Sequence, residues 1–223
     1  MKSPTQQRID NTDLKGFLEQ SRSRSFRAGA TIMAADEEPT TINYLVSGSV
    51  EVVIETEEGK ELVLAFLNEG HFFGEMGFFN QKTERSAWVR ARKDSVVAEL
   101  SYEQFGEFSQ SNPSLVFELA TQLSIRLART NNRVGNLAFL GVSGRVAKVL
   151  LELAEEPDAV DLAGGRRLKY TQPQLARIVG CSREMISRVL KLLQSEGLIT
   201  ADDGIIVWGE FEQRAVRETQ LAV

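Results

Sequence analysis

The sequence has few of the residues that metal centres and nucleophilic enzymes use, with one cysteine (Cys181) and one histidine (His71) among 223 residues. A single cysteine excludes an internal disulfide. Zinc sites use about four cysteine or histidine ligands and iron–sulfur clusters about four thiolates, so we expect neither. Nothing near Cys181 in the sequence supplies the base that would activate its thiol. We therefore expect no metal and no enzymatic activity.

Long apolar runs are also missing. No stretch approaches the ~18–20 apolar residues of a membrane-spanning helix. The first twenty residues are polar and contain no apolar signal core. We expect a cytoplasmic protein without membrane attachment. The net charge of −5 argues against nucleic-acid binding only if the charges are evenly spread, and they are not.

Residues 25–102 have the pattern of short β-strands. Runs of β-branched and aromatic residues are interrupted at Gly48 and Gly59, and the Glu-Gly-Lys around Gly59 predicts a hairpin. Several strands at such spacing predict a sandwich or jelly roll. The four phenylalanines that follow are predicted to belong to its core: Phe72, Phe73, Phe78 and Phe79.

A long helix is predicted next, with Asn112 as its N-cap and Pro113 as its first residue. Its apolar stripe advances by three or four residues and is long enough to pair with a second copy: Leu119, Leu123, Leu127, Thr130, Val134 and Leu137. Thr130 and its neighbour Asn131 have two open interpretations. They set the register of a helix pair, or they reach into the β-domain. Residues 139–144, with two glycines, predict a hinge.

Residues 170–199 predict a helix-turn-helix. Thr171 and Gln174 form a capping box, Gly180 supplies a tight turn beside the small Cys181, and Ser182 caps the second helix. The core side of this second helix is predicted to be Ile186, Val189, Leu190 and Leu193. An Asp203–Gly204 turn between apolar runs then predicts a hairpin wing.

The opposite side of the second helix has the side chains that read bases in the major groove. Arginine can donate bidentately to guanine, and glutamate can accept from the cytosine amino group. Residues 166–191 contain seven basic residues and a single acidic residue, Glu184. We therefore favour double-stranded DNA as a partner over a merely solvated surface. The predicted DNA-contacting residues are Thr171, Ser182, Arg183, Glu184, Ser187, Arg188 and Lys191.

A β-domain, a long helix and a winged helix-turn-helix, in this order, resemble the cyclic AMP receptor protein (catabolite activator) family of the CRP/FNR superfamily. The resemblance covers nearly the whole chain. It rests on five segments: GEMGFF (74–79), ERSAWVRA (84–91), VGNLAFL (134–140), GRVAKVLLELAEEPDA (144–159) and IVGCSREMISRVLK (178–191). The implied fold class is α+β, with a jelly-roll domain in 1–111, a dimerisation helix and hinge in 112–140, and a winged helix-turn-helix with a C-terminal tail in 141–223.

The resemblance implies that GEMG and RSA form a phosphate-binding cassette for a cyclic nucleotide. Arg85 would pair with the cyclic phosphate, Ser86 would add a hydroxyl, and Glu75 would accept from the ribose hydroxyl. The structural alternative is that Glu75 and Arg85 form an ion pair that stabilises the loop and binds no nucleotide. The implied nucleotide-binding residues are Gly74, Glu75, Met76, Arg85, Ser86, Ala87, Thr130 and Asn131.

Thr130 and Asn131 would contact the base, one of them across the dimer. Asn131 departs from the serine or threonine usual in the family, which leaves the base preference open. We expect cyclic AMP, with cyclic GMP, cyclic di-GMP or no ligand as alternatives. The implied protein is a homodimer that binds a palindromic site and contacts RNA polymerase, with Arg22 and Arg24 as candidate contacts. A nucleotide-binding regulatory subunit acting through a protein partner is the rival from another class.

Overall fold

The computed structural model describes residues 11–80, 84–201, 204–209 and 211. The chain divides into two compact units, Met1–Arg129 and Thr130–Val223. The helix α4 (Pro113–Phe139) belongs to both, since the division falls within it. The division of the sequence at residues 111 and 140 stays a prediction. No helix in the described part of the chain is long and apolar enough to cross a bilayer.

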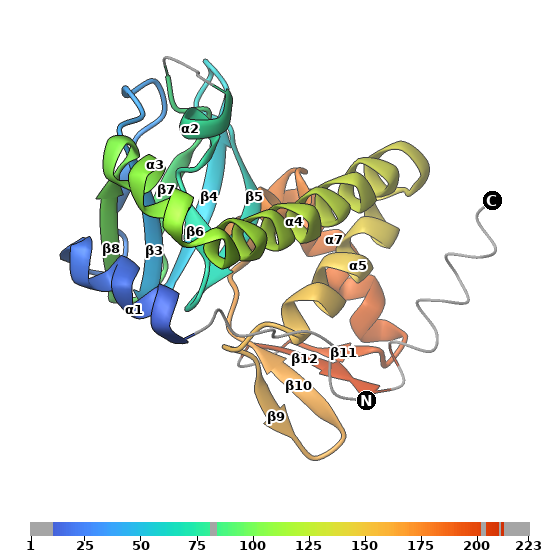
Figure 1. Cartoon of the computed structure of the whole chain (residues 1–223). Helices are drawn as coiled ribbons and strands as arrows, with labels where there is room; N and C mark the ends of the chain where they lie inside the picture. The colour runs from blue at the N-terminus through green and yellow to red at the C-terminus, as the bar shows by residue number, and fades with distance from the viewer. Residues whose placement is uncertain (1–10, 81–83, 202–203, 210, 212–223) are drawn as a thin grey trace. The chain divides into compact units, whose positions relative to one another are not determined.

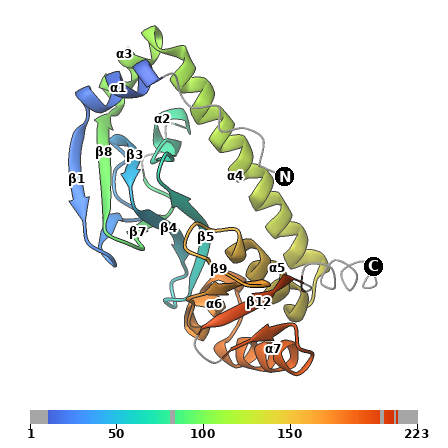
Figure 2. The same cartoon turned by 90° about the horizontal axis from the view of Figure 1, so that it is seen from below.

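The first unit contains two four-stranded antiparallel sheets (Figures 1 and 2). The first sheet has the order β1-β8-β3-β6 and the second the order β2-β7-β4-β5. The strands are β1 (Arg22–Phe26), β2 (Thr31–Met33), β3 (Thr41–Ser47), β4 (Ser49–Glu55), β5 (Glu61–Asn68), β6 (Phe72–Phe73), β7 (Trp88–Ala91) and β8 (Ser95–Ser101). The predicted hairpin at Gly59 is confirmed, because β4 and β5 pair on either side of it.

Strand β3 is buried on both faces because it separates two apolar clusters. On one face Ile42 and Tyr44 pack with Phe17, Phe105 and other residues of the helices α1 (Asn11–Gln20), α3 (Tyr102–Ser111) and α4. On the other face Leu45 packs against residues of the second sheet, such as Val50. This alternation follows from the two-residue period of a strand, and it places Asn43 on the face turned toward the second sheet.

Phe72 and Phe73 lie in the core as predicted, at 0% and 2% exposure. The prediction is wrong for Phe79, which is 49% exposed on the short helix α2 (Met76–Asn80). Phe78 takes the inner side of this helix and packs edge-on against Phe105. A five-residue helix has one inner face, so two adjacent phenylalanines cannot both use it.

Helix α4 begins at Pro113 as predicted. Asn112 has a different role from the predicted N-cap, because its side-chain amide donates to the Phe108 carbonyl and closes the preceding helix α3. The apolar stripe of α4 is buried only at its start: Leu119 is 1% exposed, whereas Leu127 is 62% and Val134 59% exposed.

The second unit contains α5 (Val142–Ala154), α6 (Gln172–Val179) and α7 (Arg183–Ser195) beside one antiparallel sheet of order β11-β12-β10-β9. Its strands are β9 (Val160–Leu162), β10 (Gly165–Leu168), β11 (Ile199–Thr200) and β12 (Ile205–Trp208). Strands β11 and β12 pair as the predicted wing, whose turn residue Asp203 lies outside the described residues. The α+β fold class is confirmed, with a β-sheet domain, a long helix and a helix-turn-helix.

Candidate functional site

The loop after β6 depends on glycine at Gly74. Its φ of +83° is in the left-handed region, and a Cβ there would lie 2.9 Å from the Thr41 carbonyl oxygen and 2.7 Å from the Met33 methyl carbon. The Tyr102 hydroxyl donates to the Gly74 carbonyl at 2.6 Å. A Cβ on Gly77 would come within 2.5 Å of Pro39. The backbone of this loop is therefore held tightly against neighbouring segments, and no side chain fits at either glycine.

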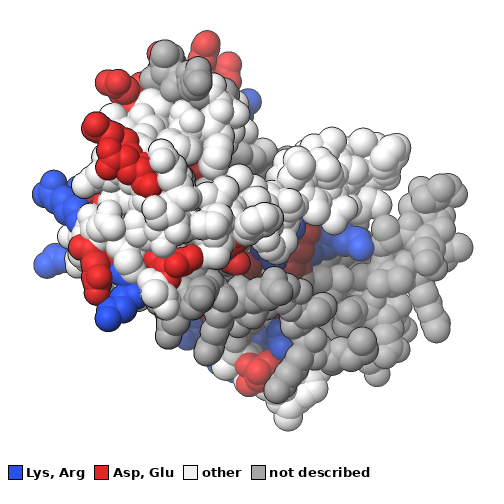
Figure 3. Space-filling model, in the orientation of Figure 1, with Lys and Arg blue, Asp and Glu red and all other residues white. Residues whose placement is uncertain are grey.

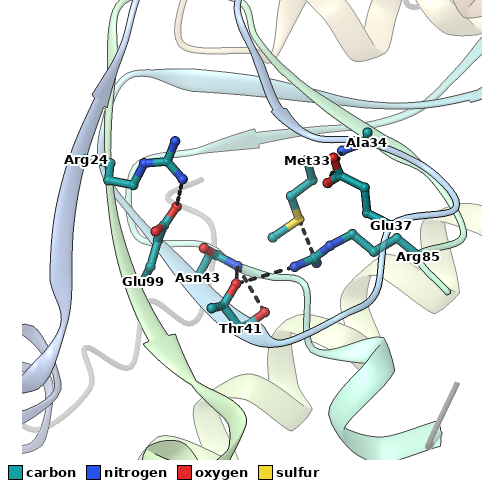
Figure 4. A network of polar contacts seen from close by, with 8 residues as sticks. All are labelled: Arg24, Met33, Ala34, Glu37, Thr41, Asn43, Arg85 and Glu99. Atoms are coloured by element: carbon teal, nitrogen blue, oxygen red, sulfur yellow. Dashed lines mark hydrogen bonds and ion pairs between the residues drawn. The ribbon is translucent and has the colours of Figure 1, made fainter. Parts of the chain in front are cut away.

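Arg85 is held over this loop by uncharged groups (Figure 4). Its guanidinium donates to the Met33 sulfur at 3.1 Å and to the Thr41 hydroxyl at 3.4 Å. Its backbone pairs with residues 36 and 37 in both directions, which fixes the position of Arg85. Among the residues that the structure describes, no carboxylate forms an ion pair with Arg85. Its positive charge is therefore available to an anion.

Beside Arg85, Asn43 offers a buried acceptor. Its amide nitrogen donates to the Thr41 carbonyl at 3.2 Å and to the Thr41 hydroxyl at 3.3 Å. Its side-chain oxygen is buried and has no hydrogen-bond partner among the described residues. Buried acceptors without a partner are uncommon, because desolvation is then not repaid. Asn43 was missed in the sequence, since nothing local marks an interior polar residue of a strand.

Glu75 does not pair with Arg85, so the structural alternative for the loop is not realised. Its carboxylate pairs instead with Arg126 of α4, with Oε1 and Nη1 separated by 3.3 Å. Burial lowers the pKa of Arg126, and the neighbouring Glu75 opposes this shift. The Arg126 guanidinium also donates to the Phe72 carbonyl. Sequence reasoning missed Arg126. A buried carboxylate needs a counter-charge, but its partner is 51 residues away along the chain.

Ser86 and Met76 bring the two parts of the predicted cassette together. The Ser86 hydroxyl is exposed and contacts the Met76 sulfur at 3.6 Å. Ala87 follows, half-buried, immediately before β7. A cation, an exposed hydroxyl and a carboxylate are thus gathered around a close-packed glycine loop. Such a set fits a small phosphate ester that also has a hydroxyl group.

Three other predicted residues have simpler settings. The His71 Nδ1–H donates to the Asn68 carbonyl at 2.9 Å, and burial lowers the pKa of the His71 imidazole. Thr130 and Asn131 are exposed on α4 and belong to the second unit, so their approach to the cassette stays a prediction. Among the described residues, no cluster of three or more histidine, cysteine or acidic side chains offers a metal site.

The helix-turn-helix is built by the predicted local signals. The capping box of Thr171 and Gln174 is present, and Gly180 ends α6 with a φ of +72°. The Ser182 hydroxyl accepts from the Met185 N–H at 3.3 Å and caps α7. Burial raises the pKa of the Cys181 thiol, which agrees with an unreactive turn residue.

The exposed side of α7, the recognition helix, forms an open concave surface. Its lining residues are Gln172, Arg183, Glu184, Ser187, Arg188 and Lys191. Gln172, at the start of α6, was not predicted. The pKa of Glu184 is lowered by hydrogen bonds that its carboxylate accepts from the Glu184 backbone and from the Ser182 side chain. The carboxylate is therefore an acceptor at neutral pH. Acidic side chains also lie on the first unit (Figure 3), where Glu103 and Glu107 are exposed on α3.

Two families match this chain, the cyclic nucleotide-binding domain over residues 23–112 and the Crp-like helix-turn-helix domain over residues 144–208. The cAMP-activated global transcriptional regulator CRP of Salmonella typhimurium is 44% identical over 87% of this chain and 92% of its own length. The chain belongs to the CRP family. Another member, the cAMP-activated global transcriptional regulator Vfr of Pseudomonas aeruginosa, is 43% identical over 83% of this chain and 88% of its own length.

Two solved structures are similar to this chain over most of its length. The c-di-GMP responsive global regulator CLP of Xanthomonas campestris has a TM-score of 0.84 and 35% identity, covering 90% of this chain and 100% of its own. A CRP/FNR family transcriptional regulator of Thermus thermophilus has a TM-score of 0.76 and 30% identity, covering 91% and 100%. As a member of the CRP family, the chain is a cyclic-nucleotide-responsive, DNA-binding transcription regulator and not an enzyme.

Proposed function

We propose that the chain is a homodimeric regulator whose affinity for a palindromic DNA site is raised by cyclic AMP. The observation that supports this most is the setting of Arg85, whose guanidinium contacts only a thioether and a hydroxyl among the described residues. A cyclic phosphate would supply the missing negative charge. Ser86 would add its hydroxyl, and the second oxygen of Glu75 would accept from the ribose. Relatives at 43–44% identity are named as cAMP-activated.

The test is calorimetric titration with cyclic AMP, cyclic GMP and cyclic di-GMP. We expect cyclic AMP to bind the wild-type protein and Arg85→Leu to lose this binding while remaining folded. Arg24→Leu is the matched control, because Arg24 lies on β1 and pairs with Glu99 at 2.9 Å, outside the cassette (Figure 4). Undiminished cyclic AMP affinity in Arg85→Leu would contradict the assignment.

Cyclic di-GMP is the second candidate, favoured by the likeness to the c-di-GMP responsive regulator. The family resemblance favours a cyclic mononucleotide instead, because members that bind cyclic di-GMP can replace the serine that follows the cassette arginine, and this chain has Ser86 there. The same titration separates these ligands. DNA binding that no nucleotide alters would favour a ligand-independent regulator. Nucleotide binding without any DNA binding would favour a regulatory subunit.

A second copy of the chain would cover part of the exposed apolar surface of α4. The exposed apolar residues of this helix are Phe117, Ile125, Leu127, Val134, Leu137 and Phe139, with exposures from 46% to 80%. Of these, Leu127, Val134 and Leu137 share one side of the helix and continue the predicted stripe, which favours a parallel helix pair. Dimeric helix-turn-helix proteins, the catabolite activator among them, place their recognition helices roughly 34 Å apart, one turn of DNA. Light scattering should show a dimer for the wild type and a shift to monomer for Leu127→Glu.

On DNA, Arg183, Glu184 and Arg188 would contact base edges, with Ser187, Lys191, Thr171 and Ser182 nearby. Because the target is chromosomal, the protein would act in the cytoplasm. RNA polymerase is the further proposed partner, with Arg22 and Arg24 on the exposed edge strand β1 as contacts. Transcription in vitro checks this: Arg22→Ala with Arg24→Ala should lower activation without weakening DNA binding.

A further inference from the structure

Strand β6 is an edge strand whose outer side needs hydrogen-bond partners. It has only two residues, and within the first sheet it pairs with β3 alone. Buried backbone N–H and C=O groups need partners, since an unmade hydrogen bond is costly. Among the described strands, none pairs with this side of β6, and Phe72 is fully buried. Side chains of α4 supply these hydrogen-bond partners.

Gln122 takes the place of a neighbouring strand. Its side-chain oxygen accepts from the Phe72 N–H at 2.9 Å, and its side-chain nitrogen donates to the Gly70 carbonyl at 2.9 Å. One amide thus makes the same donor and acceptor pair that a peptide group of another strand would make. Gln122 is 8% exposed, so water cannot readily replace either bond. Its amide nitrogen also donates to Glu118 at 3.0 Å.

One turn further along α4, Arg126 extends this contact toward the cassette. It donates to the Phe72 carbonyl and pairs with Glu75. Two successive turns of the helix therefore hold the segment from Gly70 to Glu75. Gly74 and Glu75 belong both to this segment and to the predicted cassette, and Gly74 is confined by Met33 and Thr41. The segment therefore cannot move without moving the cassette.

We propose that Gln122 is a positioning residue that transmits nucleotide binding from the cassette to α4. This rests on the proposed function. Met33 and Thr41 contact both Arg85 and Gly74, so an anion that moves Arg85 would also shift the Gly74 segment, and the two bonds of Gln122 would pass this shift to α4. A ligand changes an equilibrium only through such differential contacts between two states. Without Gln122, the cassette would still bind nucleotide, but the helix would no longer respond.

The decisive quantity is the factor by which saturating cyclic AMP raises DNA affinity. We would measure it for wild type, Gln122→Met and Gln122→Ala, on a duplex selected with the wild-type protein. Methionine keeps the length of glutamine without its donor and acceptor, and alanine leaves room for water to satisfy Phe72 and Gly70. Glu118→Gln is the control, because it changes the neighbour and keeps both bonds to the strand. Calorimetry gives the cyclic AMP affinity of each variant.

Coupled sites typically change each other's affinity by about 5- to 150-fold. We expect the factor in both Gln122 variants to fall below about threefold, with cyclic AMP affinity within about fivefold of wild type. Glu118→Gln should keep the wild-type factor. If Gln122 has only a structural role, its replacement will lower the free energy of unfolding and leave the factor unchanged. That result would overturn this inference and leave the proposed function standing. A wild-type protein that binds no cyclic nucleotide would overturn the proposed function, and this inference with it.

Discussion

Replacing Arg126 by methionine measures how strongly the cassette is tied to α4. The change leaves Glu75, whose side chain is 7% exposed, without its counter-charge, and it removes a donor from the Phe72 carbonyl. Breaking a buried ion pair by removing one partner costs about 3–5 kcal/mol. The Arg126 side chain is itself 21% exposed, so water recovers part of this. We therefore expect the first unit to lose about 3 kcal/mol of its free energy of unfolding.

The two tryptophans make this measurement specific to one unit. Trp88 lies in β7 of the first unit and Trp208 in β12 of the second. In a Trp208→Phe background, Trp88 fluorescence follows urea unfolding of the first unit alone. Glu75→Gln by itself should cost about 1.5 kcal/mol, because the amide still accepts from Arg126. The double variant should be no less stable than Arg126→Met, which corresponds to a coupling energy of about 1.5 kcal/mol. Strictly additive effects would show that the pair does not stabilise the loop.

Two further predictions concern DNA specificity and pH. Arg183→Ala should relax base preference at its contact by about 1–3 kcal/mol, and a binding-site selection that returns the wild-type motif would argue against this contact. Burial lowers the pKa of His71 in the folded state, so its contribution to stability is present above the unfolded pKa of about 6.5 and is lost as the pH falls toward the folded pKa. His71→Phe should reduce the loss of unfolding free energy between pH 8 and pH 5.5, followed by Trp88 fluorescence, and an unchanged slope would assign that loss to other groups.

The helix-turn-helix was predictable from sequence because its determinants are local. The capping box of Thr171 and Gln174, the left-handed Gly180 and the Ser182 cap each act within four residues, and the structure has all of them. The same holds for the apolar side of α7 and for the start of α4 at Pro113. Short-range hydrogen bonds and helical periodicity determine these features.

The partners within the cassette were not predictable in this way. Arg126 and Gln122 contact residues 51 and 50 or more positions away, and no local pattern marks such contacts. The orientation of Phe79 and the backward bond of Asn112 depended on which neighbours the fold supplied. For Arg85 the family resemblance indicated a role. Only the structure shows that the hydrogen bonds of its guanidinium among the described residues go to a sulfur and a hydroxyl.

The neutral surroundings of Arg85 have a practical consequence for handling the protein. With no internal carboxylate competing among the described residues, the guanidinium will attract small oxyanions from the medium. Phosphate or sulfate ions from the buffer should therefore compete for the cassette and lower the apparent affinity for every cyclic nucleotide. Titrations in chloride or in zwitterionic buffers of low ionic strength will report the intrinsic affinity.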